Sequence, residues 1–180
     1  MDIETKRFVL RAVEPEDASY LAELINDPEV RGSLGAYSLI FPVSVDMEAK
    51  WISETARKDD QVHLMITRRK GGEPIGVLSL KDINRRNGSA HLSIILERMS
   101  WDKGYGAEAI KGTLEFLFDK MNFHRVWLRV AEDNLRAISC YEKCGFAKEG
   151  SLREDHLTHG GWKNSFVMSV LVDDFRRSRR

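Results

Sequence analysis

The sequence lacks the features that would direct it to a membrane, to secretion or to nucleic acid. None of its 180 residues belongs to an apolar run of eighteen, so no membrane span is expected. Residues 1–7 carry no apolar core, so no secretory signal is expected either. Basic and acidic side chains number 28 each, and a formal net charge of zero gives no general attraction to nucleic acid or anionic lipid.

The chain is also poor in cysteine. Cys140 and Cys144 are its two cysteines, four residues apart on a predicted helix. Their spacing from His124 or His156 matches no usual zinc signature, so we expect no metal and interpret both as buried thiols. Two thiols and no signal segment fit a reducing compartment, and we therefore expect a cytoplasmic location.

No repeat, low-complexity segment or linker divides the chain. We expect one domain over residues 1–175, followed by a solvated basic tail at 176–180. Apolar alternation predicts strands at 8–13, 61–69, 74–81, 90–96, 123–131, 146–156 and 162–172. Helical spacing predicts helices at 15–26, at 44–57, after the glycines at 104 and 106, and at 134–144, with an apolar loop at 27–42. This order predicts an α/β domain with a mixed, mostly antiparallel sheet of about seven strands flanked by helices.

The most informative stretch is residues 101–110, where a predicted strand passes into an amphipathic helix. Gly104 and Gly106 lie at this junction. Glycine lets a ligand approach the backbone closely, and the first N–H groups of a helix are free to bind an anion. The junction therefore indicates a phosphate site, although two glycines at this spacing also occur in packing turns.

A second stretch, residues 134–146, strengthens the interpretation of the first. It begins with Asn134, continues through Tyr141 and ends with Gly145 and Phe146. Together the two stretches resemble the Gcn5-related N-acetyltransferases, which transfer acetyl from acetyl-coenzyme A to an amine. The resemblance implies that acetyl-coenzyme A is the co-substrate.

The resemblance also assigns the cofactor contacts. It implies that backbone N–H groups of one loop hold the pyrophosphate, and this loop consists of Lys103, Gly104, Tyr105, Gly106 and Ala107. Trp101 stands where arginine or glutamine is usual, and Asp102 stands where glycine is common. The preceding strand is implied to part from the next one and to offer backbone hydrogen bonds to the pantetheine arm from Ile94, Ile95 and Leu96.

Asn134 and Tyr141 lie two helical turns apart, near one face. The resemblance implies that Asn134 reaches the pantetheine, and asparagine is also a good helix N-cap, so both roles can coexist. Tyr141 is implied to lie beside the coenzyme sulfur. A departing thiolate is assisted by a hydroxyl that donates a proton, so we predict Tyr141 as the catalytic residue, with a core tyrosine as the alternative.

The general base is left open by the sequence. The acceptor ammonium must lose a proton before it attacks. A glutamate found on the fifth strand of some N-terminal acetyltransferases is matched here by Arg129. The remaining candidates are His91, Ser93, Asp82, Glu154, Asp155 and His156.

Flanking stretches resemble one subgroup of the family. Residues 6–18 and 149–169 are similar to ribosomal-protein N-terminal acetyltransferases and to their polyamine-acetylating relatives. We therefore predict acetylation of a peptide N-terminal α-amine, with a polyamine or other small amine as the alternative acceptor. The acceptor is predicted to enter between residues 27–42 and the last hairpin and to contact Tyr37 and Phe41, although a loop packed on the core is an equal alternative.

Two other classes of function are left open by the sequence. A non-catalytic module that binds acyl-coenzyme A would keep the glycines, and a nucleic-acid-associated protein would use the basic end of the chain. We expect neither a membrane nor a nucleic-acid partner, and a homodimer stays open.

Overall fold

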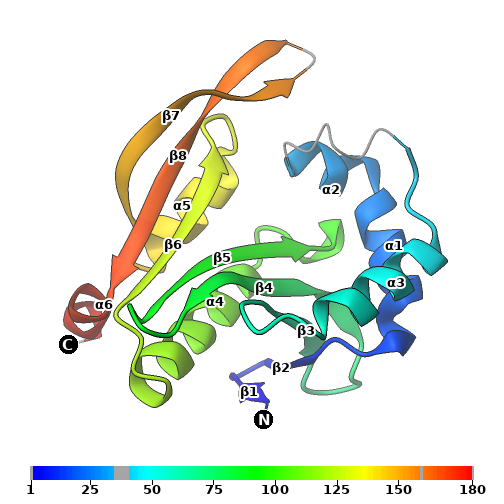
Figure 1. The fold of residues 1–180 in the computed structure, drawn as a ribbon, viewed down its shortest axis with the longest axis horizontal. Coiled ribbons are helices and arrows are strands. Elements are labelled where there is room, and N and C mark those ends of the chain that lie inside the picture. Colours follow the sequence, from blue (N-terminus) through cyan, green and yellow to red (C-terminus); the bar gives the residue numbers. More distant parts are fainter. Residues whose placement is uncertain (1, 35–40, 159, 180) are drawn as a thin grey trace.

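The structure is a computed structural model that describes residues 2–34, 41–158 and 160–179 (Figure 1). Its described strands form one eight-stranded sheet in the order β1-β2-β3-β4-β5-β6-β8-β7. Neighbouring strands are antiparallel except β5 and β6, which are parallel. The predicted mixed, mostly antiparallel α/β fold is confirmed, with eight strands in place of about seven.

The strands are β1 (Ile3–Glu4), β2 (Phe8–Ala12), β3 (Val62–Arg68), β4 (Pro74–Asn84), β5 (Ser89–Leu96), β6 (Arg125–Ala131), β7 (Ala147–Thr158) and β8 (Gly161–Leu171). The α-helices are α1 (Ala18–Asn26), α2 (Pro28–Ser33), α3 (Val45–Thr55), α4 (Tyr105–Glu115), α5 (Leu135–Lys143) and α6 (Val172–Ser178). Short 3-10 turns precede α1 (η1, Pro15–Asp17) and α4 (η2, Arg98–Ser100), and a π-type turn, η3 (Phe116–Lys120), extends α4.

Helix α2 lies in the segment predicted as a loop. Its first turn is capped by Asp27, whose side chain accepts hydrogen bonds from the N–H groups of Glu29 and Val30, and Pro28 occupies the first turn. Aspartate followed by proline is a common helix start. The loop prediction was wrong here because a six-residue helix is too short to show a clear apolar period.

The boundary predicted between the domain and its basic tail falls inside a helix. Helix α6 crosses the boundary placed between residues 175 and 176. Arg179 reaches Asp119 at 3.0 Å and Glu115 at 3.2 Å, and Arg176 lies 3.8 Å from Asp119. The arginines therefore lie against acids of α4 and η3.

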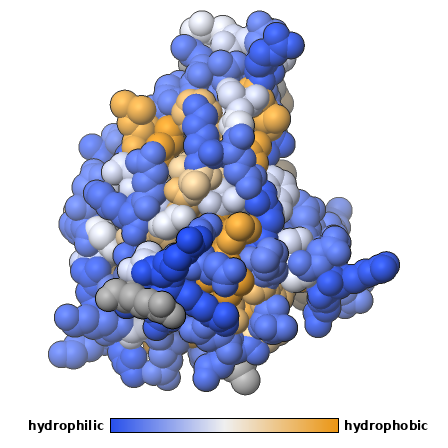
Figure 2. All heavy atoms as spheres, turned by 90° about the vertical axis from the view of Figure 1, so that its left-hand side faces the viewer, coloured by the Kyte–Doolittle hydropathy of each residue, from blue (hydrophilic) through white to orange (hydrophobic). Residues whose placement is uncertain are grey.

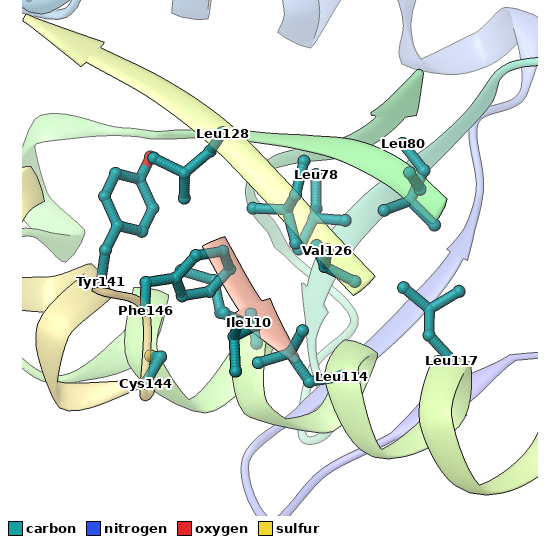
Figure 3. Packing of buried hydrophobic residues seen from close by; sticks show 14 of the residues in the cluster. Leu78, Leu80, Ile110, Leu114, Leu117, Val126, Leu128, Tyr141, Cys144 and Phe146 are labelled. Atoms are coloured by element: carbon teal, nitrogen blue, oxygen red, sulfur yellow. The ribbon is translucent and has the colours of Figure 1, made fainter. Parts of the chain in front are cut away.

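Helices cover both faces of the sheet, and the alternation of side chains along each strand decides which helices they meet. On β3 and β4, Leu64, Ile66, Leu78 and Leu80 join the cluster that contains Ile110 and Leu114 of α4 (Figure 3). The intervening residues, Met65 and Val77, join a second cluster with residues of α1 and α3. Over residues 62–66 of β3 and 76–81 of β4, odd-numbered positions therefore face α1 and α3 and even-numbered positions face α4, whereas Ile75 and Ile83, beyond the two register shifts, join the α4 cluster.

The β7–β8 hairpin projects from the body of the molecule (Figure 1). The side of the molecule on which it lies is mostly hydrophilic, with separate apolar patches (Figure 2). Leu157 and Trp162 pair across the hairpin and are both exposed. No helix of the described residues is long and apolar enough to cross a membrane.

The pairing within the sheet is interrupted between β5 and β6. These strands pair only where residues 89–91 meet residues 125–127. Beyond that point β5 stays paired with β4 as far as Leu96, and β6 stays paired with β8 as far as Ala131. The two strands therefore diverge, as Figure 1 shows, and the edge of β5 over residues 92–96 has no neighbouring strand among the described residues.

Gly76 sets the path of β5 on its paired side. A Cβ atom at this position would lie 2.2 Å from the carbonyl oxygen of Ile95 and 2.9 Å from the Cα atom of Leu96. Both contacts are to backbone, which cannot rotate away as a flexible side chain can. A glycine is therefore required where β4 passes β5.

We predict that Gly76→Ala lowers the free energy of unfolding by about 2 kcal/mol or more, because the strand must shift to admit the methyl group. Denaturant unfolding measures this change. Gly150→Ala in β7 is the control, since a Cβ atom added at Gly150 would meet no described atom within 4 Å. Equal stability of the two variants would contradict the account.

Candidate active site

A cavity of about 590 Å³ opens where β5 and β6 part. It is bounded by β5, the turn before α4, the first turn of α4, the end of β6 and α5, and it also reaches Ser33 and Leu34 at the end of α2. The sequence-predicted residues that line it are Ile94, Ile95, Leu96, Gly104, Tyr105, Gly106, Ala107, Asn134 and Tyr141. Lys103 is exposed and is not among the lining residues.

The first turn of α4 offers free backbone donors to this cavity. Gly104 is the N-cap, in a left-handed conformation with φ of 71°. The first intrahelical bond is donated by the N–H of Glu108 to the carbonyl of Gly104, at 3.1 Å. The N–H groups of residues 105–107 are therefore not used by the helix and can bind an anion.

Side chains on both sides hold this turn in place. The indole N–H of Trp101 donates to the carbonyl of Leu96 at 2.9 Å, which ties the turn to the end of β5. On the other side, the Arg7 guanidinium lies 2.5 Å from the carboxylate of Glu108 and 4.6 Å from the centre of the Tyr105 ring. The helix start is thus supported independently of any ligand.

The conformation of Asp102 explains a departure from the family pattern. Its φ of 57° lies in the left-handed region, which glycine adopts most easily. Aspartate tolerates this conformation better than most residues, so the backbone keeps the geometry. Its carboxylate is the only one among the described lining residues.

Of the three β5 residues predicted to contact pantetheine, not all have backbone groups that face the open edge of the strand. The N–H of Glu97 donates to the carbonyl of Ile75 on the β4 side. In an antiparallel pair, backbone groups alternate between the two edges, so those of Ile95 also face β4 and those of Ile94 and Leu96 face the gap. Because Trp101 already occupies the carbonyl of Leu96, Ile94 is the residue with both backbone groups open to a ligand.

Asn134 caps α5 and also connects it to α2. Its side-chain oxygen accepts from the N–H of Ala137 at 3.1 Å, and its side-chain nitrogen donates to the carbonyl of Ser33 at 3.2 Å. The N-cap alternative is confirmed, and the amide also lines the cavity. A contact between Asn134 and pantetheine stays a prediction.

Tyr141 lies at the inner wall of the cavity. Its ring packs 5.8 Å from that of Phe146, with the hydroxyl turned away from α5 (Figure 3). Burial raises the pKa of Tyr141, and the neighbouring thiols Cys140 and Cys144 act in the same direction. The hydroxyl is therefore protonated at neutral pH and can donate a proton.

The two cysteines differ in exposure. Cys144 is buried, as expected, and its thiol lies 3.6 Å from the carbonyl of Ala107. Cys140 is half-buried and lines the cavity, so the interpretation of both thiols as buried was wrong for this one. Among the described residues no group of three or more histidine, cysteine or acidic side chains could hold a metal ion.

Of the candidate bases on β4 and β5, Ser93 lines the cavity. His91 packs on Trp127 at 4.5 Å and is not a lining residue. Burial lowers the pKa of His91, the charges of Lys81 and Arg129 act in the same sense, and the Asp82 carboxylate opposes them. His91 is therefore neutral at pH 7.

The candidate bases on β7 are engaged elsewhere or exposed. Asp155 forms an ion pair with Arg129, and His156 lies 3.3 Å from the hydroxyl of Ser165. Glu154 is exposed at an irregularity in the β7–β8 pairing. None of the three β7 residues lines the cavity in the described part of the chain.

The two predicted acceptor contacts gain no support. Tyr37 lies outside the described residues. Phe41 is described, and its side chain is 78% exposed and does not line the cavity. A role for either residue in binding the acceptor stays a prediction.

Several cationic side chains at the cavity were not predicted. Arg136 and Lys143 on α5 are seven residues apart and both line it, with Arg136 stacked 3.4 Å from the centre of a ring of Trp101. Their two-turn spacing on the helix that carries Tyr141 was a usable signal. Lys81 on β4 gave no signal, because the pairing of β4 with β5 had to be known first.

Comparison with known proteins identifies the family. Residues 7–147 match the family model described as an acetyltransferase (GNAT) domain, and the chain therefore belongs to the GNAT acetyltransferases. It is 27% identical over 169 residues to a spermidine N(1)-acetyltransferase of Vibrio cholerae, covering 94% of this chain and 95% of that protein. It is 24% identical over 168 residues to a putative ribosomal N-acetyltransferase of Bacillus subtilis, covering 92% of each.

A solved structure agrees in fold. The spermidine N-acetyltransferase from Vibrio cholerae in complex with CoA and spermine has a TM-score of 0.84 and 25% identity, over 94% of this chain and 98% of that one. The protein is thus an acyltransferase with acetyl-coenzyme A as co-substrate.

We predict that Tyr141→Phe keeps the fold and nearly keeps the affinity for acetyl-coenzyme A, since the ring packs without its hydroxyl. The turnover number kcat should fall about 100-fold, the scale for removing a positioned acid. Steady-state kinetics with an identified amine and calorimetric coenzyme binding separate the two effects.

Tyr20→Phe is the matched control, because it removes a buried hydroxyl that has no partner in the described structure and does not line the cavity. It should leave kcat unchanged. An unchanged kcat in Tyr141→Phe would instead remove this residue from the chemistry.

Proposed function

We propose that this protein transfers acetyl from acetyl-coenzyme A to the α-amine of a peptide N-terminus by direct attack. The observation that supports the chemistry is the meeting of three features in one cavity: the open edge of β5, the free N–H groups of α4 and the protonated hydroxyl of Tyr141.

The proposed reaction follows from these positions. The N–H groups of α4 hold the pyrophosphate, and Ile94 aligns the pantetheine arm along β5. The neutral amine attacks the thioester carbonyl, the carbon–sulfur bond breaks, and Tyr141 supplies a proton to the departing thiolate. Ser93 lines the cavity and is placed to contact the amine or a water that takes its proton.

The distribution of charge favours an α-amine over a polyamine. A polyamine carries several ammonium groups and requires nearby carboxylates. One side of the predicted entrance for the acceptor, residues 27–42, contains two acids, Asp27 and Glu29. Asp27 caps α2, and Glu29 forms an ion pair with Arg98 at 2.7 Å, so both carboxylates already have partners.

The cavity itself also provides few carboxylates that could bind the ammonium groups of a polyamine. Lys81 and Arg129 line it, and both carry positive charge. The single carboxylate among its described lining residues is Asp102, in the turn before α4. An acceptor with one ammonium group therefore meets less repulsion here than one with three.

A polyamine is the second candidate, and the comparisons favour it. A spermidine N(1)-acetyltransferase is among the similar proteins, and a solved relative is described with CoA and spermine. A non-catalytic module is disfavoured, because such a module has no use for a protonated hydroxyl at the cavity wall.

Location and assembly belong to the same proposal. Both cysteines are free thiols, which fits a reducing cytoplasm. One relative from Vibrio cholerae is described as dodecameric, and for the present chain a homodimer stays open.

The proposal is tested by release of free thiol from acetyl-coenzyme A in the presence of separate amines. Peptides with free N-termini should be acetylated with kcat/KM at least about tenfold above spermidine, since one unfavourable charge contact is worth about 1.4 kcal/mol or more. Peptides blocked at the N-terminus are the control and should give no thiol. Spermidine as the best acceptor would establish the second candidate.

A further inference from the structure

We infer that Lys81 binds a carboxylate of the acceptor, so that the preferred substrate is an amine with an acidic group close to it. This inference rests on the proposed function and narrows its substrate class. It concerns the part of the cavity that faces away from α4, where the acceptor is proposed to enter.

The position of Lys81 follows from the sheet. It occupies an odd-numbered place on β4, like Val77, and it pairs with His91 on β5. Its side chain therefore lies on the face covered by α1 and α3 and lines the cavity from there. Strand β4 lies between β3 and β5, and the charge of Lys81 lowers the pKa of both His63 and His91.

Lys81 is the cation on this side that lacks an internal counter-charge. None of the ion pairs formed by described residues includes it. Arg129, the other lining cation there, is paired with Asp155. The next residue, Asp82, lies in a separate shallow depression with Asp59 and Asp60 and does not line the cavity.

The distance along β5 limits where the carboxylate can lie. His91, the pairing partner of Lys81, precedes Ile94 by three residues, which is about 10 Å at the usual strand rise of about 3.4 Å. The flexible four-carbon stem of lysine can cover part of this interval. A carboxylate on the first or second residue of a peptide, or on a free amino acid, therefore falls within reach while the amine meets the thioester.

The test compares pairs of acceptors that differ only in one charge. The peptides Asp-Ala-Ala-amide and Ala-Asp-Ala-amide are measured against their asparagine counterparts, together with free aspartate and spermidine. In the wild-type protein at least one acid should exceed its amide about tenfold in kcat/KM, the scale of a hydrogen bond to a charged group. The pair of acceptors with the largest ratio of kcat/KM identifies the position of the carboxylate.

Lys81→Gln should reduce this ratio to about twofold or less, mainly by raising KM for the acidic acceptor more than KM for its amide counterpart. Lys81→Met, which keeps the apolar stem, should give the same result if the glutamine variant folds poorly. Lys58→Gln is the matched control and should keep the full ratio, because Lys58 also acts on His63 but does not line the cavity.

Three results would overturn the inference. The first is a ratio near one for every pair in the wild-type protein, and the second is a ratio that survives in both Lys81 variants. The third is a preference for spermidine, which would leave acetyl transfer intact but remove both the acidic acceptor and the α-amine acceptor in favour of the second candidate. Absence of thiol release with every amine would instead remove the proposed function as well.

Discussion

The parting of β5 from β6 is the constraint on which the site depends. Three residue pairs hold the strands together, after which β4 retains β5 and β8 retains β6. The sheet therefore stays continuous while one internal edge opens. Backbone groups of Ile94 are left without a strand partner, and such groups require water or a ligand. An extended amide chain such as pantetheine can take the place of the missing strand.

The two helices at the site follow from the same opening. Helix α4 follows β5 after the η2 turn, and Trp101 ties the turn before the helix to Leu96. Helix α5 follows β6, and the contact between Asn134 and Ser33 joins it to α2 across the gap. Divergence of the strands therefore sets the separation between the anion-binding turn and the helix that carries Tyr141.

The motifs predicted many of the residues that line the cavity near α4 and α5, because the sequence signals of these residues are local. A phosphate site at a strand-to-helix junction depends only on local backbone groups. Gly104 and Gly106 could therefore be predicted as part of such a site before the fold was known. The acceptor half depends on pairings between distant strands, and Lys81 becomes informative only once it lies opposite His91. A short helix such as α2 shows no apolar period in the sequence that would predict it. The ion pairs of Arg179 were not predictable either, because its partners on α4 and η3 lie far from it in the sequence.

Amide hydrogen exchange tests the central claim most directly, because it reads the open edge residue by residue. In the free protein the N–H of Ile95, which faces β4, should exchange slowly, and that of Ile94 should exchange quickly although it lies within the sheet. Acetyl-coenzyme A at about 100 times its dissociation constant should slow Ile94 by about 100-fold and leave Ile95 nearly unchanged. An Ile94 amide that is already as slow as Ile95 without coenzyme, or that stays fast at saturation, would contradict the account.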